Sequence, residues 1–416
     1  MLSLSHSRNV YNDLKNRELG ASKFDGTYIE NLFIKNIKED NYTTTIFNGH
    51  NSPVINFDVK DFFAATLSLD NNIRLWNLET GKCLWSTMHQ LMFNEFGLIK
   101  IVEDKIVFSG TSYVNSQPKN VFKIVGLISG NETAQIKENM IMGTACMVGK
   151  KIFGLIDNFS IGEWNLDGEF IQRVDIEKAQ LEKAQQNYSL TNLNNFLVYR
   201  SGNFVVLYDP AKNKSREFTF PNFTGSRISC LHLDENYLIA GYSVVINRDI
   251  FLCIVDLNTE KQFEIRIEIK ATPESSGYFH SINNIVANQN KILLAHSSGN
   301  IIIYNFEDNS LSILGKHLTP VKELVLEGPI LFTRSSSYFG DPGEIKLWDI
   351  STMKLLSAQK CVGNNKVQFT SQKIFTTTEN SFMQKNYLVS HKGVTLSEET
   401  LKVEYISEET DECWIQ

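Results

Sequence analysis

The sequence predicts an all-β protein built as a closed ring of repeated four-stranded units. A chain of 416 residues is too long to fold around one ordinary hydrophobic core. A closed array of repeats can reach this length, because it grows by adding units. Short apolar strands that follow a polar pair recur eight times, at intervals of 38 to 54 residues. Phe (27) and Tyr (14) are abundant, as is typical of strands. Repeats of about this length predict the blades of a β-propeller.

The candidate second strands define eight repeats. They begin at Phe62, Lys105, Lys151, Asn195, Tyr237, Lys291, Pro329 and Lys373. Six repeats continue into a third strand that ends in an apolar or aromatic residue followed by Asn or Asp. Those endings are Trp76-Asn77, Trp164-Asn165, Tyr208-Asp209, Val255-Asp256, Tyr304-Asn305 and Trp348-Asp349. The second and eighth repeats lack this ending. The sequence therefore favours eight blades, with seven as the alternative if either weak repeat is not a full blade.

The two ends of the repeat array are predicted to meet in one blade. Tyr42–His50 has the pattern of a fourth strand with no first three strands before it, whereas the eighth repeat has an uncertain fourth strand. Pairing Tyr42–His50 into the blade that contains Lys373–Glu379 closes the ring and removes two exposed strand edges. We expect an N-terminal helix and lead-in at 1–41, the propeller at 42–395 and a C-terminal tail at 396–416.

Two segments outside the repeats have helical patterns. Residues 7–22 place apolar side chains at helical spacing and end near Gly20, which suits a helix C-cap. Residues 175–187 are rich in helix formers and place apolar residues on roughly one face. For the second segment we expect a short helix packed on the ring, with a partner-binding helix as the alternative.

The first repeat, Gly49–Asn77, carries the most specific motif of the chain. It combines a Gly-His pair, two apolar runs and an alternating strand that ends in Leu-Trp-Asn. We expect Asp70 to accept a hydrogen bond from His50. The Ser68 hydroxyl is expected to hold that histidine and to face the indole N–H of Trp76. Such a network satisfies buried polar groups, so the predicted role of these residues is structural and not catalytic.

This repeat resembles the WD40 repeat, with Asn77 at the position where that family usually has Asp. The resemblance spans roughly residues 42–395 but is sharp only in the first repeat. In the fourth repeat, for example, Arg200 stands at the position of Ser68. We therefore expect the later blades to be held by apolar packing and strand pairing without the buried polar network. The resemblance implies a rigid platform for protein–protein interaction.

The opening of the chain adds a second resemblance. Residues 5–23 are similar to the linker that joins the F-box to the propeller in F-box/WD-repeat proteins, although no Leu-Pro motif of an F-box precedes them. As an alternative function, this resemblance implies the substrate-recognition part of a ubiquitin-ligase-like complex that lacks its F-box.

The composition of the chain limits the classes of partner, cofactor and cellular location that we expect. The net charge is −7 and no basic block is present, so no nucleic-acid partner is expected and a basic peptide is favoured over an acidic one. The six cysteines form no CxxC pair and the eight histidines are scattered, so no metal or other cofactor is expected. No apolar run is long enough to span a membrane, and the N-terminus lacks the apolar core of a signal peptide. We expect a cytoplasmic protein, with export by a specialised secretion system as the alternative.

The predicted binding surface is one rim of the ring. Loops that join second to third strands, and fourth strands to the next blade, emerge on the same rim, and in this chain they are long. They comprise residues 88–96, 109–120, 270–280 and 335–344. Because Tyr and Arg are favoured interface anchors, they supply the candidates for binding a protein or peptide partner. The predicted partner-binding residues are Tyr113, Arg200, Arg334 and Tyr338. Burial under its own loop is the alternative for each tyrosine, and a structural ion pair inside the ring is the alternative for Arg200.

Two rival classes of function remain. An enzyme would need acidic or histidine groups that converge on the central channel, and the sequence has no repeated Asp box and no glycine-rich phosphate loop. Asp70 and Asp157 both follow second strands, where turn formation explains them. A structural subunit of a larger assembly is the third class. We predict a non-catalytic scaffold or adaptor, with its partner, pathway and oligomeric state left open.

Overall fold

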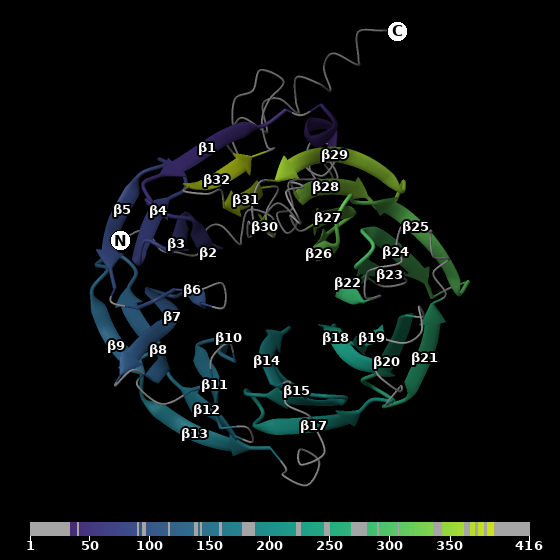
Figure 1. Ribbon diagram of the computed structural model, residues 1–416, viewed down its shortest axis with the longest axis horizontal. Helices are drawn as coiled ribbons and strands as arrows, with labels where there is room; N and C mark the ends of the chain where they lie inside the picture. The colour runs from purple at the N-terminus through teal and green to yellow at the C-terminus, as the bar shows by residue number, and fades with distance from the viewer. Residues whose placement is uncertain are drawn as a thin grey trace, which may run out of the picture.

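The computed structural model describes residues 34–39, 41–89, 91–93, 97–114, 117–136, 140–141, 144–157, 160–176, 188–221, 226–244, 250–267, 281–288, 291–306, 308–335, 343–361, 367–370, 373–377 and 381–386. Eight four-stranded antiparallel sheets form a ring around a central axis (Figure 1). In seven sheets the strands follow one another in sequence order from the inner to the outer edge. The protein is therefore an eight-bladed, all-β propeller. The preference for eight blades over seven is confirmed, and the weak second and eighth repeats are full blades.

Blades one to four occupy the first half of the ring. Blade one is β2 (Val54–Lys60), β3 (Phe63–Ser68), β4 (Asn72–Asn77) and β5 (Cys83–Met88). Blade two is β6 (Ile99–Val102), β7 (Lys105–Val114), β8 (Gln117–Gly126) and β9 (Glu132–Ile136). Blade three is β10 (Cys146–Val148), β11 (Lys151–Asp157), β12 (Ser160–Trp164) and β13 (Phe170–Asp175). Blade four is β14 (Tyr188–Leu193), β15 (Phe196–Ser201), β16 (Phe204–Asp209) and β17 (Lys214–Thr219).

Blades five to eight form the second half of the ring. Blade five is β18 (Ser226–Leu233), β19 (Tyr237–Val244), β20 (Ile250–Asp256) and β21 (Gln262–Ile267). Blade six is β22 (Ile282–Asn288), β23 (Lys291–His296), β24 (Asn300–Asn305) and β25 (Ser310–Lys316). Blade seven is β26 (Val321–Glu327), β27 (Ile330–Ser335), β28 (Gly343–Asp349) and β29 (Lys354–Cys361). Blade eight is β30 (Val367–Thr370), β31 (Lys373–Thr377), β32 (Ser381–Asn386) and β1 (Thr43–Asn48).

Blade eight joins the two ends of the described chain. β1 pairs antiparallel with β32 over six residue pairs, from Thr43 opposite Asn386 to Asn48 opposite Ser381. Phe47 is fully buried and meets the ring of Trp76 edge-on at 5.7 Å, so the closing strand also packs on blade one. The predicted pairing of the N-terminal strand into the last blade is confirmed.

The middle strands of the blades are buried because neighbouring blades cover both of their faces. All five residues of β12 are buried, as are five of the six in β3. Between blades one and two, for example, Leu67 and Leu75 share a cluster with Ile101 and Phe108. The outermost strands β5 and β13 alternate exposed and half-buried residues. This packing explains why the second strands read as nearly continuous apolar runs.

The aromatic-polar endings of the third strands form the turns to the fourth strands. Asn77 Oδ1 accepts the amides of Glu79 and Thr80 at 3.0 and 2.8 Å. Asp256 and Asp349 accept the amides two and three residues ahead in the same way. Asparagine can replace aspartate here because only a carbonyl-type acceptor is required.

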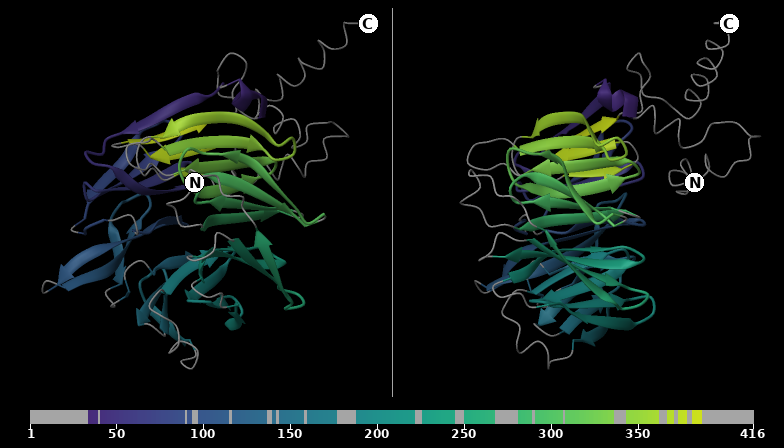
Figure 2. Two further views of the ribbon diagram at one scale, coloured as in Figure 1. Left: turned by 45° about the vertical axis from the view of Figure 1, so that its right-hand side comes forward. Right: turned by 90° about the vertical axis from the view of Figure 1, so that its right-hand side faces the viewer.

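The ring has two distinct rims, seen edge-on in Figure 2. We call upper rim the side that carries the connections from second to third strands, such as 69–71, and from each blade to the next, such as 89–93. The lower rim carries the other turns, such as 78–82. A helical turn at residues 34–38 places Ile37 in an apolar cluster with Ile330 and Phe332 of blade seven. In the described part of the chain, no helix has the length and apolar character to cross a membrane.

Two sequence-based expectations about loops and helices need correction. Residues 109–120 were expected to form a loop, but β7 and β8 continue as a long hairpin in which Tyr113 pairs with Pro118 and Val114 with Gln117. Asp175, expected to begin a helix, is the last residue of β13. The rest of that predicted helix and the predicted helix at 7–22 lie outside the described residues.

Candidate functional site

A hydrogen-bonded network on blade one links it to the closing strand. His50 lies just after β1, and its Nδ1 is 3.0 Å from Asp70 Oδ2. Its Nε2 is 2.8 Å from Thr66 Oγ1, and the Trp76 indole N–H donates to the same hydroxyl at 2.8 Å. The neutral histidine protonated on Nδ1 satisfies all three contacts, with the Thr66 O–H donating to Nε2. Burial lowers the pKa of His50 and outweighs Asp70, which acts in the opposite direction. The lowered pKa favours this neutral form.

The hydroxyl at the centre of this network belongs to Thr66 and not to Ser68, as the sequence had suggested. In the β3–β4 ladder Trp76 pairs with Ala64, and Thr66 lies two residues further along the same face. Ser68 lies two residues beyond that, out of reach of the indole. It donates instead to the Ser52 carbonyl at 2.8 Å and accepts the Asp70 amide at 3.2 Å.

Blade seven contains a similar network, which was not expected from its sequence, although its histidine Nδ1 has no hydrogen-bond partner among the described residues. His317 Nε2 is 2.7 Å from Thr333 Oγ1, and the Trp348 indole N–H donates to that hydroxyl at 2.9 Å. Glu344 is the carboxylate that corresponds to Asp70, and its Oε2 lies 3.5 Å from His317 Nδ1. The histidine precedes the threonine by sixteen residues in both blades, and this spacing is the signal that would have revealed it.

Blade three shows what happens without the hydroxyl. It keeps the tryptophan, as Trp164, but Gly154 stands where blade one has Thr66, because Trp164 pairs with Ile152 as Trp76 pairs with Ala64. The Trp164 indole N–H is buried and has no hydrogen-bond partner among the described residues. Apolar packing and strand pairing are joined here by a different buried polar contact, in which Glu163 pairs with Lys151 at 2.6 Å and accepts a hydrogen bond from Gln172 at 2.8 Å.

The carboxylates of the two networks also fix the backbone of the upper rim. Asp70 Oδ2 accepts the amide of Asn51 at 3.0 Å, and Glu344 Oε2 accepts the amide of Leu318 at 3.0 Å. Burial would raise the pKa of Asp70, but hydrogen bonds from backbone amides and from His50 outweigh it and lower that pKa. Each carboxylate is therefore ionised at neutral pH and holds the residue after its histidine in one position.

Large apolar side chains are exposed on the upper rim beside these networks. Leu318 is 78% exposed, Met88 71%, Met92 57% and Leu69 47%. Met88 pairs with Asn72 at the upper end of blade one, and Met92 bridges to Thr111 of blade two. Leu69, Met88 and Met92 thus belong to one blade and the connection that leaves it. Sequence analysis missed all four, because it ranked aromatic residues and arginines first.

The predicted partner-binding residues are not brought together. Arg200 is half-buried in blade four, where Nη1 donates to the Ile228 carbonyl of blade five at 2.9 Å. Arg334 pairs with Glu323 of the same blade at 2.9 Å. Tyr113 lies in β7 on the long hairpin of blade two, and Tyr338 lies outside the described residues. Both arginines therefore have partners inside the ring, and the partner that positions Arg200 here is a backbone carbonyl.

Among the aromatic residues of the predicted long loops, the one whose side chain the structure describes is buried. Phe93 is 5% exposed and packs edge-on against Phe108 at 6.2 Å. It is tucked under its own loop and offers no anchor to a partner. Phe96, Tyr278, Phe279 and Phe339, which also belong to the long loops, lie outside the described residues.

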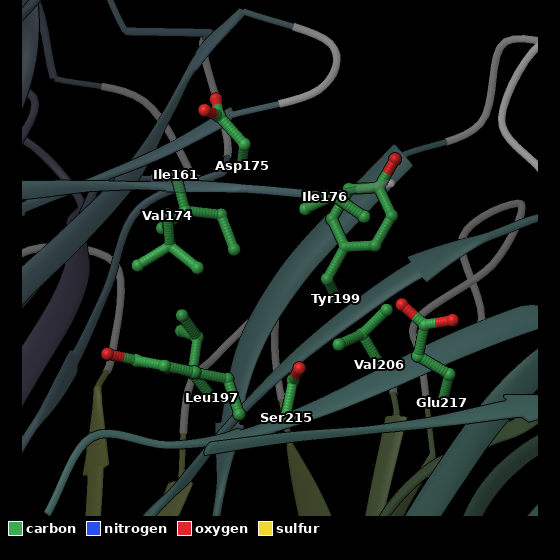
Figure 3. A pocket seen from close by; sticks show the side chains of 10 residues that line it. Ile161, Val174, Asp175, Ile176, Leu197, Tyr199, Val206, Ser215 and Glu217 are labelled. Atoms are coloured by element: carbon green, nitrogen blue, oxygen red, sulfur yellow. The ribbon is translucent and has the colours of Figure 1, made fainter. Parts of the chain in front are cut away.

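A small cavity lies between blades three and four (Figure 3). Ile161, Val174, Leu197 and Val206 supply much of its wall, and the carboxylates of Asp175 and Glu217 stand well apart in this view. Its volume is about 30 Å³, room for about two water molecules. It is too small for a substrate. In the described ranges, no three His, Cys, Asp or Glu side chains gather as a set that could hold a metal ion.

Comparison with known proteins bears on the fold. No protein-family model matches the sequence, and no curated protein matches it. The computationally designed protein Ika8 is similar in structure, with a TM-score of 0.59 and 14% identity over 82% of this chain and 98% of that one. BamB from Moraxella catarrhalis has a TM-score of 0.57 and 10% identity over 80% of this chain and 96% of that one. At such identities only the fold is shared. The class is an eight-bladed β-propeller, without sequence support for the WD40 family in particular.

Proposed function

We propose that the protein is a non-catalytic scaffold or adaptor that binds a protein or peptide on its upper rim. The observation that carries this proposal is the exposure of Leu69, Met88, Met92 and Leu318 on that rim. Large apolar side chains in contact with water mark surfaces that a partner covers. Propellers commonly mediate protein–protein interaction, and a closed ring presents its rim with little loss of conformational entropy on binding.

The chemistry of the surface fits a partner with apolar side chains. Methionine is flexible and polarisable, so Met88 and Met92 can adapt to the shape of an inserted side chain. Leu69 and Leu318 are held by backbones that are already hydrogen-bonded: the Leu69 amide donates to Pro53 and the Leu318 amide to Glu344. The anchors of the interface are therefore aliphatic in this proposal, with Tyr113 and Tyr338 as additional predicted contacts.

Membership of the WD40 family belongs to the same proposal. Two blades share a histidine, a threonine, a tryptophan and a carboxylate in one arrangement, centred on Thr66 and Thr333. This supports the resemblance that the first repeat suggested. A cytoplasmic location remains a prediction from the sequence.

The test compares matched surface variants in an affinity pull-down. Met88→Ser with Met92→Ser should lower recovery of the captured partner at least tenfold, about the effect of losing 1.4 kcal/mol of binding free energy. Ile128→Ser with Met353→Ser is the control, because these two residues are exposed on the lower rim. Thermal melts establish that all variants fold. Loss of capture in the lower-rim variant alone would show that the binding face is the other one.

A further inference from the structure

A basic surface with an exposed leucine lies where the outer strand of blade six leads into the upper end of blade seven. Lys316, Lys322 and Lys360 are all exposed, and none of their ammonium groups meets a carboxylate among the described residues. Leu318 is the most exposed large apolar side chain in the described part of the chain, at 78%. We call these four residues the blade-seven surface.

Contacts and strand pairing place Lys316, Leu318 and Lys360 close together around Glu344 and Lys346. The Lys346 ammonium donates to the Lys316 carbonyl at 2.8 Å and lies 3.0 Å from Glu344 Oε2, which also accepts the Leu318 amide. Lys360 is directly opposite Glu344 in the β28–β29 ladder. Lys322 lies on the innermost strand, so the surface extends about 15 Å across the four strands.

Among the described residues at this end of the blade, the acidic side chains already have basic partners. Glu323 pairs with Arg334 at 2.9 Å, and Glu344 pairs with Lys346. The three exposed lysines therefore leave an uncompensated positive charge next to an apolar side chain. The complementary ligand is a segment that carries several carboxylates and interspersed apolar residues.

The chain itself contains such a segment in residues 396–416, the predicted C-terminal tail. It has seven acidic residues and one lysine, a net charge of −6 out of −7 for the whole protein, which leaves −1 for all other residues. The tail is also apolar in part, with Leu401, Val403, Tyr405, Ile406, Trp414 and Ile415. The net charge that favoured a basic partner therefore belongs to the tail and not to the ring.

The tail can reach this surface. The last described strand, β32, belongs to blade eight, which is adjacent to blade seven (Figure 1). Lys385 of β32 contacts Gln359 of β29 directly. Nine residues, 387–395, separate Asn386 from the tail, and the ten steps from Asn386 to residue 396 span up to about 35 Å. A blade strand of six to eight residues is only about 20–27 Å long, so the connection covers the height of the ring.

We propose that residues 396–416 dock on the blade-seven surface of their own chain, with carboxylates beside Lys316, Lys322 and Lys360 and an apolar side chain on Leu318. The contact covers part of the upper rim and removes the most exposed apolar residue from water. Leu318 belongs to both surfaces, so a docked tail leaves Leu69, Met88 and Met92, on blade one and the connection to blade two, for the proposed partner. The pull-down with Met88 and Met92 changed therefore tests the proposed function separately.

The test is zero-length carbodiimide crosslinking of the full chain at low protein concentration, followed by peptide mass spectrometry of the monomer. Carboxylates of the tail should form amide crosslinks with Lys316, Lys322 or Lys360. Raising the salt to about 0.5 M should reduce their yield, because these pairs are exposed and are screened. Crosslinks of the tail only to lower-rim lysines, only between two molecules, or not at all would overturn the proposal.

Charge exchange provides the matched variants. Lys316→Glu with Lys360→Glu should lower the yield at Lys322 at least about tenfold, since two weak attractions become repulsions. Glu408→Lys with Glu409→Lys should lower it similarly, and the combination of all four changes should restore it. Lys354→Glu is the control, because Lys354 is exposed on the lower rim of the same blade. An equal loss in this control, or no recovery in the combined variant, would contradict specific docking.

Discussion

His50 and Thr66 are sixteen residues apart and are joined by a 2.8 Å hydrogen bond that connects the closing strand to blade one. The histidine follows β1, the outermost strand of blade eight, whereas the threonine is in the second strand of the next blade. The same bond recurs between His317 and Thr333 at 2.7 Å, from blade six to blade seven. The network therefore joins adjacent blades, which gives it a direct bearing on the stability of the ring.

Thr66→Val should lower the free energy of unfolding by about 1–3 kcal/mol, because it leaves the Trp76 N–H and the His50 ring nitrogen without partners in a buried site. Valine has nearly the same shape, so the loss reports the hydroxyl and not a cavity. Ser68→Ala is the comparison, with a smaller loss expected because Ser68 bonds only backbone groups. Urea unfolding measures both. A larger effect for Ser68 would mean that the serine holds the network.

Asp70→Ala should destabilise the protein by about 1–3 kcal/mol, because the carboxylate accepts hydrogen bonds from His50 and from the amides of Asn51 and Asn72. Thermal melts of the variant decide the matter. Glu79→Ala, an exposed change in the turn after β4, should melt like the parent protein. An unchanged melting temperature for Asp70→Ala would show that this carboxylate contributes nothing to the fold.

Stability should fall as the pH drops from 6.5 toward 4. Burial lowers the pKa of His317 to about 4, and Lys346 acts in the same direction. In the unfolded chain this histidine titrates near 6.5, so the neutral form is favoured on folding. Its contribution is complete above pH 6.5 and is lost progressively below it, by about 1 kcal/mol at pH 5.5. His89, with a pKa lowered to about 4 chiefly by burial, adds to the effect.

Urea unfolding between pH 7.5 and pH 4.5 measures this dependence. His317→Gln should be less stable at neutral pH but should show a shallower decline with pH, because one titrating group is gone. A decline of unchanged slope would assign the pH dependence to other residues.

Phe47→Ala should cost about 3–5 kcal/mol, because this side chain of the closing strand is fully buried against Trp76. Ile46→Ser is the matched control, since the neighbouring residue is 54% exposed and should change stability by less than about 0.5 kcal/mol. Equal effects of the two changes on urea unfolding would mean that β1 does not hold the ring closed.

The strand pattern of this chain could be predicted because it depends on local sequence. Each second strand is covered by two neighbouring blades, so β3, β11 and β31 read as apolar runs without reference to any distant residue. The closing strand was predictable for the complementary reason. Tyr42–His50 resembles a fourth strand with no blade of its own, and an unpaired edge must be covered.

The polar networks were harder to predict because they depend on strand register. Thr66 and Ser68 are both hydroxyl residues on one face of β3, and only the pairing of Ala64 with Trp76 selects Thr66. In blade seven, Thr333 and Trp348 are fifteen residues apart instead of ten, and the carboxylate is Glu344. That insertion hid the motif. Arg200 was misjudged because the sequence does not show the Ile228 carbonyl that lies beside it.

The pairing of β1 with β32 sets the order in which the molecule can be assembled. Phe47 and Phe382 are paired backbone positions in this ladder although they are 335 positions apart in the chain. On the ribosome, seven blades emerge before the strands that accept β1 exist, and throughout that time the nascent ring has an unsealed seam. Contacts of such long range form slowly, because a very large loop must close first. We therefore expect closure to be a late and slow event of folding, and a chain that stops before β32 lacks the strand to which β1 pairs.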